Sequence, residues 1–270
     1  MTMHPFDDAI SLADKGGSRF AGRTTPAFAN MVGPFGGSTA AALLQAVLQH
    51  PDRQGDPLAL TVNFGGAIAY GDFEVVAKPA RTNRSNQHWT MEIIQNGEVT
   101  TTATAICGVR RESFDSTELG FPAVPAPGDV EEQHLPEFIA WAQNYEMRFT
   151  EGGLDPANPN PSESASSRST LWIRETPARA VDFTALTAIC DSFYPRVYLR
   201  KGAMMPASTV TFTVYFHADE AMLARQGDDY LLGSARAQRF GNGYFDQVGE
   251  VWSRDGELLA TTHQLVYFKG

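Results

Sequence analysis

Ser38 lies in a segment whose residue types suggest a nucleophile, because Gly36–Ala40 approaches the G-x-S-x-G pattern. In that pattern a serine on a sharp strand-to-helix turn attacks an acyl carbonyl with the help of a His and an Asp. Here Ala40 replaces the last glycine, and the surrounding sequence does not indicate the α/β sheet that the pattern requires. We therefore interpret Ser38 as the N-cap of a helix.

The histidine and cysteine side chains have no spacing that is typical of a metal site. Cys107 and Cys190 lie far apart in apolar runs, without a C-x-x-C pair. Gly241-Asn242-Gly243 precedes a strand-like run rather than a helix, so it indicates a turn and not a dinucleotide loop. The six histidines form no H-x-x-H pair and stand at positions 4, 50, 88, 134, 217 and 263. We expect neither a metal nor a cofactor.

The charge balance excludes several classes of partner. Asp and Glu number 31 against 21 Lys and Arg, which gives a formal net charge of −10. A protein that binds nucleic acid or an anionic membrane needs a basic surface, so neither is expected as a partner. No apolar stretch approaches the roughly 18 residues of a membrane helix, and the first residues lack the pattern of a secretory signal. Together with two widely separated thiols, this predicts a soluble, cytoplasmic protein.

Two segments have the apolar spacing of an amphipathic helix. The first is Ser38–His50, which Pro51 would end. The second is Asp182–Phe193, with Asp182 as its cap and Pro195 beyond its end. These are the clearest helical signals in the sequence, and the remaining elements that could position reactive side chains are strands.

Each helix is followed by four strand-like runs rich in Val, Thr, Phe and Tyr. In both sets the last two runs are joined by residues typical of a tight hairpin, Asn96-Gly97 and Asp255-Gly256. Shorter strands are predicted before the helices at Ser18–Thr24, Asn144–Phe149 and Ser169–Arg174. The eight main runs are Leu58–Gly65, Asp72–Ala80, Gln87–Asn96, Glu98–Cys107, Ser208–His217, Tyr230–Phe240, Tyr244–Arg254 and Leu258–Phe268.

The repeated order of helix and four strands predicts a duplicated fold. Val62-Asn63-Phe64 aligns with Val214-Tyr215-Phe216 as one anchor of the repeat. We predict an N-terminal unit at 1–112, a linker at 113–136 rich in Pro, Glu and Gly, and a C-terminal unit at 137–270 with a flexible insertion at 152–167. A long helix wrapped by an antiparallel sheet, present twice with the two sheets joined edge to edge, is the double hot-dog architecture of the α+β class.

The chain resembles the type II acyl-CoA thioesterases, a double hot-dog family. The resemblance covers about 17–108 and 144–268, and its first-half motifs are Pro34-Phe35-Gly36-Gly37, Gly71-Asp72 and Ile94-Gln95-Asn96-Gly97. In the second half the family carries an Asp in its helix, a Ser or Thr at the start of the next strand, and a Gln in the last strand. These three side chains orient the water that hydrolyses the thioester.

Carried over residue by residue, the resemblance implies that Asp191, Thr209 and Gln264 are the catalytic residues. Thr211 and Thr213 are expected on the same strand face as Thr209, so the hydroxyl position could shift by two residues. Counted from the glycine anchors, the first-half counterpart of Gln264 is Ala105, so the polar set is expected in one half only.

The resemblance implies hydrolysis of a fatty acyl-CoA by a water that Asp191 activates as general base. Thr209 and Gln264 would hold that water, and backbone N–H groups near Gly36–Gly37 could stabilise the oxyanion. Coenzyme A is anionic, and the candidate basic residues for its binding are Arg81, Arg84, Arg110, Arg111, Arg196, Arg200 and Lys201.

Two alternatives stay open. One is a non-catalytic hot-dog protein that binds acyl thioesters, in which Asp191 is only structural. The other is a hot-dog hydratase or dehydratase, which is disfavoured because those enzymes pair a catalytic His with a carboxylate and no helix His lies near Asp191. A homodimer of double units is expected because sheet edges are often paired or covered.

Overall fold

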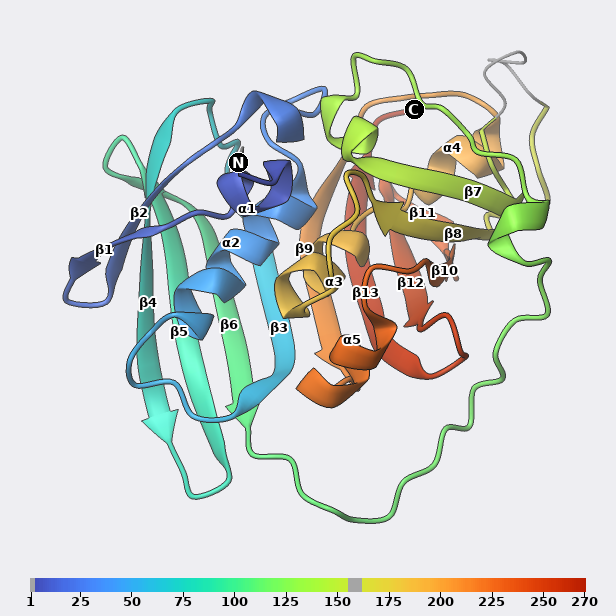
Figure 1. Cartoon of the computed structure of the whole chain (residues 1–270). Helices are drawn as coiled ribbons and strands as arrows, with labels where there is room; N and C mark the ends of the chain where they lie inside the picture. Colours follow the sequence, from blue (N-terminus) through green and yellow to red (C-terminus); the bar gives the residue numbers. More distant parts are fainter. Residues whose placement is uncertain (1–2, 155–161) are drawn as a thin grey trace.

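A computed structural model describes residues 3–154 and 162–270 and is built around one antiparallel sheet (Figure 1). The first half of the chain contains α1 (Pro5–Ala9), β1 (Ala13–Gly16), β2 (Arg19–Arg23), η1 (Pro26–Phe28), α2 (Gly36–Leu48), β3 (Asp56–Phe64), β4 (Asp72–Thr82), β5 (Asn86–Gln95) and β6 (Glu98–Gly108). The connection and the second half contain η2 (Pro127–Asp129), η3 (Ala140–Asn144), β7 (Tyr145–Glu151), β8 (Ser169–Glu175), α3 (Phe183–Ile189), α4 (Arg196–Lys201), β9 (Ala207–Phe216), α5 (Glu220–Gln226), β10 (Leu231–Arg236), β11 (Phe240–Gly241), β12 (Tyr244–Trp252) and β13 (Leu258–Phe268).

The strand order repeats itself in reverse about the middle of the sheet. It runs β1-β2-β4-β5-β6-β3 in the first half and β9-β13-β12-β10-β8-β7 in the second, with β11 paired to β12. The halves meet where β3 pairs with β9, and Thr61 opposes Thr213 at the centre of this seam. Their hydroxyl oxygens lie 3.0 Å apart. The predicted double hot-dog fold, with two units joined edge to edge, is therefore confirmed.

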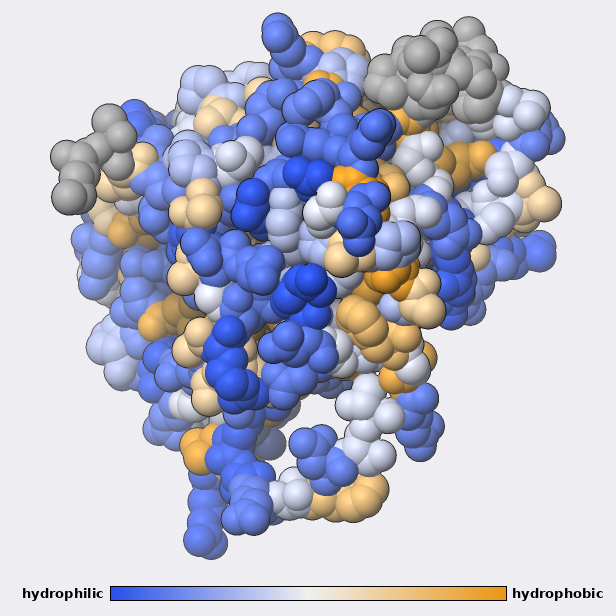
Figure 2. All heavy atoms as spheres, turned by 45° about the vertical axis from the view of Figure 1, so that its right-hand side comes forward, coloured by the Kyte–Doolittle hydropathy of each residue, from blue (hydrophilic) through white to orange (hydrophobic). Residues whose placement is uncertain are grey.

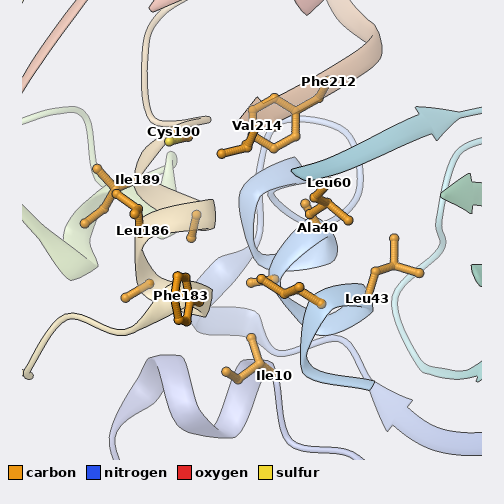
Figure 3. Packing of buried hydrophobic residues seen from close by; sticks show 14 of the residues in the cluster. Ile10, Ala40, Leu43, Leu60, Phe183, Leu186, Ile189, Cys190, Phe212 and Val214 are labelled. Atoms are coloured by element: carbon orange, nitrogen blue, oxygen red, sulfur yellow. The ribbon is translucent and has the colours of Figure 1, made fainter. Parts of the chain in front are cut away.

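The helices α2 and α3 cover the same face of the sheet and pack against each other (Figure 1). Their apolar side chains meet those of the two seam strands in a continuous core (Figure 3). Leu43 of α2, Leu186 of α3 and Phe212 of β9 are all fully buried there. Burial of such side chains stabilises the fold by roughly 1.5–3 kcal/mol each. The core therefore spans the seam and ties the two halves together.

The first-half elements agree with the sequence-based prediction within a few residues, with one correction. The helix begins at Gly36, with Phe35 as N-cap, so Ser38 is not the N-cap. The Ser38 hydroxyl instead donates to the Phe35 carbonyl at 2.8 Å from inside the first turn. Ser38 therefore satisfies a backbone acceptor of its own helix.

The second predicted helix is shorter than expected. Asp182 caps it as predicted, and its carboxylate accepts the Ala185 N–H at 2.8 Å. The helix then ends at Ile189, because the N–H groups of Asp191 and Ser192 bond to carbonyls only three residues back. The interpretation of Asp191 as a helical residue is therefore wrong, and Asp191 lies in the turn that follows α3.

The segment after β6 forms an exposed arch around the second half (Figures 1 and 2). It returns to the body where the Phe121 ring packs against Trp172 and Trp252. Part of the insertion predicted at 152–167 lies outside the described residues. Across the described ranges, no helix is long and apolar enough to cross a membrane.

Candidate active site

The first turn of α2 lies against the turn that follows α3. Two glycines permit this close approach. A Cβ atom on Gly36 would stand 2.7 Å from Oδ2 of Asp191, and one on Gly37 would stand 2.7 Å from the carbonyl oxygen of Ala188. The Gly37 backbone N–H donates a hydrogen bond to the Asp191 carboxylate. The first half thus supplies the backbone that holds a side chain of the second half.

The three residues implied by the family resemblance form one hydrogen-bonded series. Gln264 of β13 donates from Nε2 to Oδ1 of Asp191 at 2.8 Å. The Thr209 hydroxyl of β9 donates to Oε1 of the same carboxamide at 3.2 Å. Gln264 is 5% exposed, whereas Asp191 and Thr209 are only partly buried. The structure therefore brings together a carboxylate, a carboxamide and a hydroxyl from three distant stretches of the chain.

A β-bulge turns Thr209 toward Gln264. Thr211 pairs with Leu265 and Thr209 pairs with Val266, which leaves Val210 as an extra residue in β9. A bulge of this kind reverses the face on which the preceding residue points. The expectation that Thr209 shares a face with Thr211 and Thr213 is therefore wrong. Thr213 instead bonds to Thr61 at the seam.

Although Asp191 as a residue stays partly exposed, the surrounding protein desolvates its carboxylate and raises its pKa to about 7. The hydrogen bonds from Gln264 and from the Gly37 N–H act in the opposite direction, since they stabilise the charged form. A carboxyl group whose pKa lies near neutrality is suited to accept a proton during a reaction and to release it afterwards. The geometry and the proton affinity therefore both fit a general base.

The first half has the same backbone but not the same side chains. Pro57 pairs with Cys107 and Ala59 pairs with Ile106, so Leu58 is an extra residue equivalent to Val210. Relative to the seam, Pro57 takes the place of Thr209. Leu60 pairs with Ala105 just as Phe212 pairs with Gln264. The register thus agrees with Ala105 as the counterpart of Gln264, and these first-half positions lack the polar pair.

Models of known families match both halves of the chain. Residues 25–108 match the acyl-CoA thioesterase N-terminal domain, and residues 120–268 match the acyl-CoA thioesterase C-terminal domain. The chain belongs to the acyl-CoA thioesterase family. This confirms the family resemblance drawn from the sequence. No sequence of a curated protein matches this thioesterase-family chain.

Solved structures show the same fold over the whole length of this family member. A conserved protein of unknown function with a hot dog fold from Alicyclobacillus acidocaldarius is 49% identical, with a TM-score of 0.94 over 100% of this chain and 99% of that chain. The acyl-CoA thioesterase II TesB2 from Mycobacterium marinum is 18% identical, with a TM-score of 0.78 over 98% of both chains. The tesB protein of Mycobacterium avium subs paratuberculosis is also 18% identical, with a TM-score of 0.79 over 98% of both.

A second buried carboxyl group in this thioesterase-family chain was not identified from the sequence. Glu175 is 4% exposed and lies opposite Tyr145 across β7 and β8. Neither the carboxylate oxygens of Glu175 nor the Tyr145 hydroxyl has a hydrogen-bond partner among the described residues. Arg179 lies 3.7 Å away but also bonds to Asp7 and Asp182. Burial therefore raises the pKa of Glu175 to about 8. The signal in the sequence was a glutamate at the end of an apolar strand.

The basic residues proposed for coenzyme A do not form one surface cluster. Arg196 is fully buried and cannot belong to a surface that binds coenzyme A. Arg110 donates to the carbonyls of Phe216 and Pro57 beside the seam. Lys201 is exposed and pairs with Glu163. In the described ranges 3–154 and 162–270, no group of His, Cys, Asp and Glu side chains could hold a metal ion.

Proposed function

We propose that this protein is an acyl-CoA thioesterase that hydrolyses fatty acyl-CoA to free acid and CoA. The observation that carries the proposal is the hydrogen-bonded series of Asp191, Gln264 and Thr209 at the junction of α2 and α3. Family membership supports the reaction class, and the series supports the placement of the chemistry in the second half.

In the proposed reaction Asp191 takes a proton from a water molecule as the water oxygen attacks the thioester carbonyl carbon. The tetrahedral intermediate then collapses, the carbon–sulfur bond breaks, and the CoA thiolate leaves. Asp191 returns its proton to the thiolate, so the carboxylate is regenerated. A pKa of about 7 for Asp191 suits both steps, because the group is substantially ionised at neutral pH yet holds a proton long enough to return it.

Gln264 and Thr209 would hold the water rather than exchange protons with it. Gln264 uses one N–H of its Nε2 group for Asp191, and the second N–H remains to donate to the water or the substrate. The Thr209 hydroxyl donates to Gln264, so its oxygen can accept a hydrogen bond from the water. Fixing a reactant in this way supplies part of the rate acceleration.

The first test is release of free CoA thiol from acyl-CoA substrates of increasing chain length. We expect hydrolysis by the wild type and a loss of about 10²–10⁴-fold in kcat for Asp191→Ala, the usual contribution of a general base. Asp246→Asn is a matched control, because Asp246 lies in β12 and bonds to the N–H groups of Gln238 and Arg239. It should leave kcat unchanged.

The outcomes of this test separate the reaction from the site. If the wild type hydrolyses none of the substrates, the thioesterase proposal fails and a binding function is favoured. If Asp191→Ala hydrolyses as fast as the wild type, the proposed site is wrong while the reaction class stands.

We also infer a homodimer located in the cytoplasm. The sheet ends at β1 and β7, and an outer strand offers backbone groups that a second chain can cover. Cys107 and Cys190 are both buried free thiols, which suits a reducing compartment. Light scattering that gives the mass of a single chain would contradict the dimer, and recovery in another cell fraction would contradict the location.

A further inference from the structure

Buried polar side chains also lie beyond Gln264, on the neighbouring strand β12 and on α4. Gln264 of β13 lies directly opposite Gln247 of β12, and Gln247 is only 1% exposed. Oε1 of Gln247 accepts a hydrogen bond from Nε of Arg196 at 3.0 Å. Directly opposite residues on neighbouring strands have Cβ atoms about 4.5–5.5 Å apart, so the Gln247 and Gln264 side chains are in reach of each other.

Arg196 is an unusual residue to bury. It is 0% exposed, and its remaining hydrogen bonds go to the carbonyls of Tyr194, Ser167 and Ala235 and to the hydroxyl of Ser169. It has no carboxylate partner among the residues that the structure describes, and its Nη2 has no partner there either. Removing a charge from water without an opposite charge nearby costs free energy. The second half thus holds a buried cation at a cost in stability.

The first half shows that the hot-dog fold does not need polar residues at these positions. The counterpart of Gln264 is Ala105, and the residue opposite Ala105 in β5 is Trp89. Trp89 is fully buried in the apolar core. The same place in the same architecture is therefore filled by apolar side chains in one half and by two carboxamides with an arginine in the other.

We propose that Arg196 and Gln247 are positioning residues that hold the Gln264 carboxamide in its working orientation. Arg196 donates to Oε1 of Gln247, which holds the Gln247 carboxamide in one orientation with its Nε2 donors turned away from the guanidinium. An N–H donor of Gln247 beside Gln264 disfavours the flipped orientation of the Gln264 amide, in which Nε2 would face that donor. The amide is thereby kept with Nε2 on Asp191 and Oε1 on Thr209.

This inference rests on the proposed function, and its test compares two substitutions of Gln247. Gln247→Leu removes the amide. Gln247→Glu keeps an acceptor for the guanidinium of Arg196 but has no N–H to offer Gln264. We expect both to lower kcat by about tenfold, the effect of about 1.4 kcal/mol, with little change in KM. We expect the melting temperature of Gln247→Glu to stay near that of the wild type.

A merely structural role would not change how Asp191 titrates. The bond from Gln264 favours the charged form of Asp191, so a misplaced amide should move the acid limb of the kcat profile to higher pH. Cys190 and Tyr145 are the neighbouring titratable groups that feel the charge of Asp191. Both lose protons well above neutral pH because burial raises their pKa, so the limb near neutrality reports Asp191.

A double-substitution cycle separates action through Gln264 from a general loss of packing. In a Gln264→Ala background, Gln247→Leu should cause no further loss in kcat. Gln226→Leu is the matched control, because Gln226 is a buried glutamine of the same half whose partners among the described residues are backbone groups of Asp229, Tyr230 and Arg254. It should lower the melting temperature without moving the acid limb.

The result that overturns the inference is a folded Gln247→Glu or Gln247→Leu protein with the kcat and acid limb of the wild type, or losses that multiply in the double variant. Failure of the proposed function is recognised separately, because the carboxyl carbon of Asp191 can be titrated by NMR without any substrate. An upward shift of that titration in Gln247→Leu, which adds no charge beside Asp191, supports the positioning role even if no acyl-CoA is hydrolysed, and an unchanged titration contradicts it.

Discussion

The two halves of this molecule share a backbone and differ in what they place on it. Both have a bulge at the same position of the seam strand, at Leu58 and at Val210. Beside it the second half carries Thr209 and Gln264, whereas the first half carries proline and alanine. The bulge therefore belongs to the architecture, and only the side chains around it distinguish a candidate reactive centre from a packed core.

The helices differ in a complementary way. In the first half α2 runs unbroken for 13 residues and begins with two glycines. In the second half α3 has 7 residues and ends in the turn that holds Asp191. Because α3 ends early and α2 begins with two glycines that lack side chains, the Asp191 carboxylate can approach the Gly37 N–H. One half supplies a donor, and the other supplies the reactive groups.

After the loss expected for Asp191→Ala, the largest effect is a pH dependence governed by the same group of the second half. Burial raises the pKa of Asp191 to about 7, and only the ionised form can accept a proton from water. We expect kcat to rise with pH up to about 7 and then to level, with a loss of about 100-fold at pH 5. A kcat profile that is flat between pH 5 and 8 would show that another group acts as the base.

The second effect concerns stability and the other buried carboxyl group of that half. The pKa of Glu175 is raised to about 8, so the folded protein keeps a proton that the unfolded chain releases above pH 4.5. The free energy of unfolding therefore falls as pH rises through this window. In Glu175→Gln this fall should be smaller by about 1.4 kcal/mol per pH unit between pH 5.5 and 7. Urea unfolding of the wild type and of Glu175→Gln at pH 5.5 and 7 measures this difference. An equal change in the free energy of unfolding for the two proteins would refute the prediction.

The third effect uses the counterpart positions directly. Gln264→Ala gives the second half the residue of the first, and we expect kcat to fall at least tenfold, or about 1.4 kcal/mol of barrier. Ala105→Gln is the reciprocal control and should leave kcat unchanged, although it places an amide in a buried apolar site and should lower stability. Unchanged kcat in Gln264→Ala would remove Gln264 from the site.

The smallest effect tests the bulge. Thr209→Val keeps the shape of the side chain but removes the hydroxyl, and we expect kcat to fall about fivefold, or about 1 kcal/mol. Thr211→Val is the matched control, because Thr211 lies beyond the bulge and faces away from Gln264. Steady-state kinetics of both variants shows whether Thr209 or Thr211 supplies the hydroxyl. A loss confined to Thr211→Val would place the hydroxyl two residues further along the strand.

Much of the fold could be predicted from the sequence because it depends on local signals. Alternating apolar residues and the Asn96-Gly97 turn located the strands, and the internal anchors gave the correct counterpart for Gln264. The end of α3 and the bulge at Val210 could not be predicted, because each is decided by packing between distant segments. The burial of Arg196 could not be predicted either, because a sequence does not show that a cation is buried.

The contact between Gly37 and Asp191 has a consequence for how the two halves depend on each other. Neither copy of the duplicated unit holds a complete set of groups, since the donor belongs to one and the acceptor to the other. The first half carries no polar pair at its own seam positions, yet the site in the second half is incomplete without the backbone of the first. The N-terminal half thus has the role that a second subunit has in a site formed between two chains.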